Sequence, residues 1–87
     1  IMQQRLADSV GVLAVFSARP GGAVRVIPQA MQWQGRRWLI DKMGFYHPER
    51  RGAKRYHIFS FASGETAFRV ELDPDTLVWT LTDVFYG

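Results

Sequence analysis

The sequence contains no cysteine, which excludes both a disulfide framework and a thiolate metal site. Long hydrophobic runs are also missing, and the longest, Val10 to Phe16, falls well short of the ~20 residues of a membrane-spanning helix. Residues 1–11 contain no apolar segment of the length that a secretory signal peptide requires. We therefore expect a cytoplasmic protein with no role in a membrane.

The chain is short, and its 87 residues predict a single domain, 1–87, with no second core. A chain of this size buries only roughly 60–65% of its unfolded surface, so large side chains must supply most of the buried area. Hydrophobic residues make up 47% of the sequence and aromatic residues 14%, too many for a disordered segment. We expect the aromatic rings, including Trp33, Trp38 and Trp79, to form the core rather than a ligand groove.

Turn-forming residues recur at short spacing, and the residues between them alternate between apolar and polar, which is typical of an all-β fold. The chain is expected to form about six antiparallel strands that make a small barrel or a strongly curved sheet of SH3-like or OB-like size. Residues 2–10 are predicted to be a short helix or a first edge strand, and Gly44 to Ala53 a loop. The strands are predicted over residues 10–17, 23–34 with a bend at Pro28, 37–43, 54–62, 65–72 and from 77 onward.

Two of the predicted turns have a specific chemistry. Gly35-Arg36 suits a two-residue hairpin turn that needs glycine first. Asp73-Pro74-Asp75-Thr76 fits a type I turn, in which Asp73 accepts hydrogen bonds from the backbone. This role explains Asp73 and Asp75 without acid–base catalysis.

Positive charge is concentrated in the first part of the chain. Residues 1–55 carry a net charge of +7 and residues 56–87 a net charge of −4, and nine of the eleven basic residues are arginine. Such asymmetry indicates binding to nucleic acid or to an acidic partner. The alternative is that acidic and basic strands lie side by side, so that cross-strand ion pairs cancel the charge.

A basic cluster interleaved with aromatic residues leads to the hypothesis of nucleic-acid binding. Arginine pairs with phosphate through its planar fork, and aromatic rings stack on bases, the combination that single-strand binders use. If the basic residues share one face, this hypothesis gains weight, and if acids of residues 65–83 neutralise them, it loses weight. The predicted surface consists of Arg36, Arg37, Arg50, Arg51, Lys54, Arg55, Tyr46 and Tyr56.

No enzymatic motif is present, since the sequence lacks a nucleophile elbow, a Walker loop, a dinucleotide fingerprint and a zinc-protease helix. His47, Glu49 and His57 offer three zinc ligands, but a fourth is missing and the spacing spans a predicted loop and a strand. We expect no catalytic residue, no metal and no cofactor. A second hypothesis is a protein-interaction module that binds a partner or itself through an open strand edge.

The stretch from Ala30 to Ile40 resembles a small bacterial domain family of uncharacterised function. The matching positions are Trp33, Gly35, Arg36 and Trp38, and the resemblance covers about residues 23–85. Members of that family occur alone and as the C-terminal appendage of Y-family DNA-polymerase-like mutagenesis proteins. The resemblance implies a bacterial cytoplasmic domain with a link to DNA repair, in a family with no known enzymatic activity.

Overall fold

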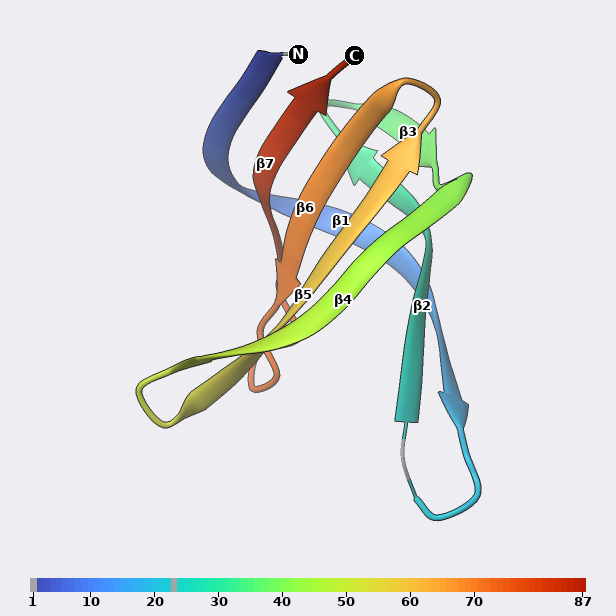
Figure 1. The fold of residues 1–87 in the computed structure, drawn as a ribbon, viewed down its shortest axis with the longest axis vertical. Helices are drawn as coiled ribbons and strands as arrows, with labels where there is room; N and C mark the ends of the chain where they lie inside the picture. Colours follow the sequence, from blue (N-terminus) through green and yellow to red (C-terminus); the bar gives the residue numbers. More distant parts are fainter. Residues whose placement is uncertain (1, 23) are drawn as a thin grey trace.

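The computed structural model describes residues 2–22 and 24–87, and every regular element in this part of the chain is a β-strand (Figure 1). Ala23, the predicted first residue of a strand, lies outside the described residues. In the part described, no helix is long and apolar enough to cross a membrane. The seven strands are β1 (Met2–Ala18), β2 (Val24–Trp33), β3 (Arg36–Leu39), β4 (Lys42–Arg51), β5 (Lys54–Ser63), β6 (Thr66–Leu72) and β7 (Trp79–Tyr86).

The strands form one antiparallel sheet in the order β3-β2-β1-β7-β6-β5-β4, which is curled into a half-barrel (Figure 1). The first half of β1 pairs with β7, from Met2 opposite Tyr86 to Val10 opposite Trp79. Its second half pairs with β2. Because one strand serves both halves of the sheet, its curvature brings the two halves toward each other.

A two-residue corner joins the two edges of the sheet at one end. The Ile40 amide donates to the Gln29 carbonyl on β2 at 3.0 Å, and the Asp41 amide donates to the Ala62 carbonyl on β5 at 3.1 Å. The chain therefore crosses from β3, at one edge, to β4, at the other, and closes the half-barrel there. Away from this corner, β2 and β4 diverge (Figure 1).

Aromatic and aliphatic side chains fill the inside of the curl, which we call the concave face. The fully buried side chains include Phe61, Phe68, Met31 and Leu81. Phe68 on β6 meets the tryptophans of β2 and β3 edge to face, at centroid distances of 6.1 Å to Trp33 and 5.1 Å to Trp38. These contacts join strands that are not neighbours in the sheet, and they confirm the expected aromatic core.

The structure corrects two sequence predictions. Residues 2–10 are not a helix but part of β1, so the alternative of a strand is confirmed, although β1 lies between β2 and β7 and not at an edge of the sheet. Gly44 to Ala53 is not a loop, because β4 extends to Arg51. The prediction was wrong because Pro48 and the polar residues around it are typical of loops. β4 is an exposed edge strand, in which polar side chains on both faces are solvated and a proline is tolerated.

The strand count and one turn also differ from expectation. The sheet has seven strands instead of about six, because the corner at Ile40 and Asp41 divides the predicted strand 37–43. The β2–β3 turn is Gln34-Gly35 instead of Gly35-Arg36, with φ angles of 53° and 68°, as a type I′ turn requires. Asp73 caps its turn as predicted, accepting from the amides of Asp75 at 2.9 Å and Thr76 at 3.2 Å.

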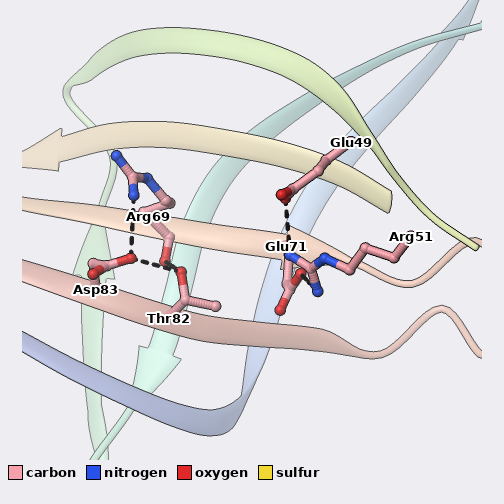
Figure 2. Close-up of polar contacts among 6 residues, drawn as sticks. All are labelled: Glu49, Arg51, Arg69, Glu71, Thr82 and Asp83. Atoms are coloured by element: carbon pink, nitrogen blue, oxygen red, sulfur yellow. Dashed lines mark hydrogen bonds and ion pairs between the residues drawn. The ribbon is translucent and has the colours of Figure 1, made fainter. Parts of the chain in front are cut away.

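A buried carboxylate on β7 connects three strands on the outside of the curl, which we call the convex face. Asp83, only 6% exposed, accepts hydrogen bonds from Gln3 on β1 at 3.0 Å and from its neighbour Thr82 at 3.0 Å. Arg69 on β6 lies 3.4 Å away (Figure 2). The carboxylate therefore has a partner on each neighbouring strand, as a buried charge needs.

Replacing this carboxylate is expected to destabilise the fold. We expect Asp83→Ala to lower the free energy of unfolding by about 1–3 kcal/mol, because it leaves the Gln3 amide and the Arg69 guanidinium without their acceptor. Asp83→Asn, which keeps the shape and one acceptor oxygen, should lose less. Urea unfolding at neutral pH measures both variants, and equal midpoints for Asp83→Ala and the unmodified chain would contradict the structural role.

Candidate functional site

The pleat of the β4–β5 hairpin sorts the predicted site residues onto two faces. Glu49 pairs with Tyr56 and Arg51 with Lys54 in the register, and these side chains project from the convex face together with those of Ile58 and Glu71. Tyr46, Arg50 and Arg55 belong to the alternate rows, which continue into the concave core through Phe59. The sequence cluster is therefore not one surface.

On the convex face, Arg51 is held by two carboxylates. Its Nη2 lies 2.9 Å from Glu49 Oε2, and its Nη1 lies 2.7 Å from Glu71 Oε2 on β6 (Figure 2). The hydrogen bond to Glu49 raises the pKa of Arg51 above its usual value, with a further contribution from the charge of Glu71. The positive charge of Arg51 is thus neutralised within the chain.

Lys54 is neutralised in the same way by the β6–β7 turn. Its Nζ donates to Asp73 Oδ2 at 2.7 Å and lies 3.5 Å from Asp75 Oδ2. The hydrogen bond raises the pKa of Lys54 and lowers that of Asp73. The acidic residues of the C-terminal segment therefore compensate part of the basic cluster, as the alternative interpretation of the charge asymmetry anticipated.

Tyr56 lies beside Arg51 and Lys54 on the convex face, and its ring is in contact with both side chains. The Arg51 guanidinium carbon lies 4.6 Å from its ring centroid, and Lys54 Nζ lies 5.3 Å from it. These distances are typical of cation–π contacts. Three predicted site residues, Arg51, Lys54 and Tyr56, therefore have partners within the hairpin and its neighbours.

Arg36 and Arg37 begin β3, whereas the hairpin cluster lies at the end of β4, so both strands and the corner between them separate the two groups. β3 and the tip of the β4–β5 hairpin lie at opposite ends of the view (Figure 1). The guanidinium carbon of Arg36 lies 3.9 Å from the centroid of the Trp38 ring, a distance typical of a cation–π contact. Arg37 pairs in register with Gln32 and lies on the alternate side of β3 from Trp38. The structure does not bring these two arginines to the hairpin cluster.

On the concave side of the hairpin, two arginines form no ion pair with the described carboxylates. Arg50 and Arg55 are directly opposite each other in the register, and both are exposed. Within residues 2–22 and 24–87, no carboxylate forms an ion pair with either of them. Like charges directly opposite each other destabilise a sheet, so this pair has no stabilising role within the chain.

Two rings lie on the same face, further along the hairpin. The Tyr46 hydroxyl and His57 Nδ1 are 2.7 Å apart and share a hydrogen bond, and the rings are nearly parallel at 19° with centroids 5.8 Å apart. Tyr46 is 50% exposed and also contacts Phe59. We call Tyr46, His57, Arg50 and Arg55 the ring–arginine surface.

A groove of about 470 Å³ lies between the diverging parts of β2 and β4, and its floor reaches the ring–arginine surface. In the part of the chain that the structure describes, its lining contains no acidic residue and contains two arginines, Arg19 and Arg25, that the predicted site did not include. They lie on either side of the β1–β2 turn, far in sequence from β4. Only the net charge of residues 1–55 hinted at them. The lining consists of Arg19, Val24, Arg25, Val26, Ile27, Met43, Gly44, Phe45, Tyr46, His57 and Phe59.

The three candidate zinc ligands do not converge. His47 and Glu49 lie on the convex side of the hairpin and His57 on the concave side. The His47 ring stacks on Phe45 at a centroid distance of 5.3 Å. Among the described residues, no group of three side chains is arranged to hold a metal ion.

Comparison with protein-family models, curated proteins and solved structures finds no match to this chain. The family resemblance of residues 30–40 stays a prediction. Any functional proposal therefore depends on the two features described above, the ring–arginine surface and the groove.

The ion pair between Lys54 and Asp73 makes stability depend on pH. Because the pKa of Asp73 is lower in the folded state, its contribution is present above about pH 4 and is lost as the pH falls through the folded pKa. Lys54, with a raised pKa, contributes until the pH rises through its folded value. We expect the difference in thermal midpoint between the unmodified chain and Asp73→Asn to shrink on acidification.

Thermal unfolding followed by circular dichroism at about pH 7 and below about pH 3 measures this difference. The matched control is Asp75→Asn, since this carboxylate is 74% exposed and farther from Lys54, and it should have a smaller effect at both values. A difference for Asp73→Asn that does not change with pH would contradict the assignment.

Proposed function

We propose that this chain is a non-catalytic module that binds single-stranded nucleic acid on the ring–arginine surface. The observation that carries the proposal is the direct opposition of Arg50 and Arg55, neither of which forms an ion pair with a carboxylate of the described residues. An anion bound by both guanidinium groups removes the repulsion between them and satisfies their planar donors. Phosphate is the anion that this geometry suits.

The neighbouring rings favour a chain that carries both phosphates and planar groups. Tyr46 lies four residues from Arg50 along β4, which corresponds to about 13 Å of strand. A ligand that reaches both needs a flat group at one end and a negative charge at the other. A single strand with unstacked bases meets this requirement, because bases stack on exposed aromatic rings in a sequence-tolerant way.

The proposed surface includes only part of the predicted surface. It contains Arg50, Arg55 and Tyr46 from the prediction and adds His57. It leaves out Arg51, Lys54 and Tyr56, which have partners on the convex face, and Arg36, which lies over the Trp38 ring. An accessory role in DNA repair is what the family resemblance implies, and it forms part of the proposal on that basis alone.

Removing both arginines is expected to abolish most of the phosphate contact. We expect Arg50→Gln combined with Arg55→Gln to weaken binding of a fluorescein-labelled thymidine oligonucleotide about tenfold or more at low salt, and to reduce the salt dependence of what remains. Fluorescence anisotropy at about 50 and about 200 mM salt measures both quantities. The matched control, Arg37→Gln, removes an exposed arginine at the far edge of the sheet and should leave binding nearly unchanged.

The ring contact is tested separately from the charge contact. We expect Tyr46→Ala to weaken binding by about 1–3 kcal/mol through lost stacking, while the slope of affinity against salt stays the same because no phosphate contact is removed. Tyr46→Phe keeps the ring and should bind normally. Undetectable binding by the unmodified chain, or binding that salt does not affect, would reject the proposed function.

A further inference from the structure

The groove between β2 and β4 is bordered by two strand edges that have no neighbour on that side. β3 pairs with β2 only from Ala30 to Trp33, so residues 24–27 of β2 have a strand partner on the β1 side alone. β4 is the last strand of the sheet and pairs only with β5. Consecutive residues of both edges line the groove, which is what exposed backbone produces.

We propose that this groove binds an extended acidic peptide of a partner protein, which enters as an added strand between β2 and β4. An extended peptide supplies amides and carbonyls to both edges, as in other cases of strand addition. The corner at Ile40 and Asp41 already joins β2 to the β4–β5 hairpin at the closed end, by backbone hydrogen bonds to Gln29 on β2 and Ala62 on β5. A strand added beyond this corner would extend the closure of the half-barrel along the groove.

The side chains of the lining specify the chemistry of the peptide. The floor offers the buried ring of Phe59, and the walls offer Val24, Val26 and Met43, so one face of the strand is apolar. Arg19 and Arg25 are the charged residues among the described lining, and no described carboxylate forms an ion pair with them. Charge complementarity therefore favours carboxylates on the other face of the strand.

This site is distinct from the proposed nucleic-acid surface, although the two meet at Tyr46 and His57. The peptide uses backbone edges, Arg19 and Arg25, whereas the oligonucleotide uses Arg50 and Arg55. The two proposals therefore fail independently: Arg50→Gln with Arg55→Gln should leave peptide binding unchanged.

The test uses two labelled eight-residue peptides, one alternating valine with glutamate and the other alternating valine with lysine. We expect the acidic peptide to bind about tenfold or more tightly than the basic one at low salt. Arg25→Glu should abolish this preference, because the new carboxylate offsets the charge of Arg19, whereas the matched control Arg37→Glu, outside the groove lining, should keep it. Equal binding of both peptides, or of neither, would overturn the proposal.

Backbone methylation distinguishes strand addition from loose electrostatic attraction. The amides of alternate residues in a strand point to opposite edges, so N-methylation of the odd positions blocks one edge and N-methylation of the even positions blocks the other. A strand inserted between β2 and β4 should lose about tenfold or more in affinity with either set. Unchanged affinity with both sets would overturn the proposal.

Two other occupants of the groove would also be detected. If the thymidine oligonucleotide displaces the acidic peptide from a variant that lacks Arg50 and Arg55, the groove binds nucleic acid. Sedimentation equilibrium that shows a dimer, broken by Arg25→Glu, would assign it to a second copy of this chain. Either result would overturn the assignment to a partner's peptide.

Discussion

The fold depends on β1, whose two halves pair with different strands. Its first half holds β7 and its second half holds β2, with a register shift in each ladder where the strand bends. The curl that results lets Phe68 on β6 reach Trp33 and Trp38 across strands that are not adjacent in the sheet. Without it, the aromatic rings would lie on one face of an open sheet, exposed to water.

The strand pleat then decides which charges are available to a ligand. Along the β4–β5 hairpin, one face meets the carboxylates of β6 and the following turn, and its basic residues are neutralised there. The other face continues into the aromatic core, and in the described part of the chain no carboxylate forms an ion pair with Arg50 or Arg55. A basic cluster in a sequence is thus divided between two faces by the period of two residues, and its two halves have different partners.

The sequence predicted the class of fold, the aromatic core and the Asp73 turn because these follow from local alternation and from turn chemistry. It failed at β4, since an exposed edge strand has no apolar periodicity and resembles a loop. The pairing of Lys54 with Asp73 was anticipated only as a general alternative, because the topology had to bring the two residues together. Arg19 and Arg25 were missed for the same reason: they face the groove only after β1 and β2 have folded across from β4.

An open edge as long as β4 invites pairing with other chains, and this strand carries features that limit it. Pro48 removes one donor from the middle of the edge, the register shift between Met43 and Tyr46 disturbs its flatness, and arginines occupy its end. Two β4 edges therefore fit each other poorly. The part of β4 before Pro48, which lies across the groove from residues 24–27 of β2, contains the register shift but neither the proline nor the arginines. The proposed peptide would gain hydrogen bonds from both edges there, whereas a single sheet edge offers only one.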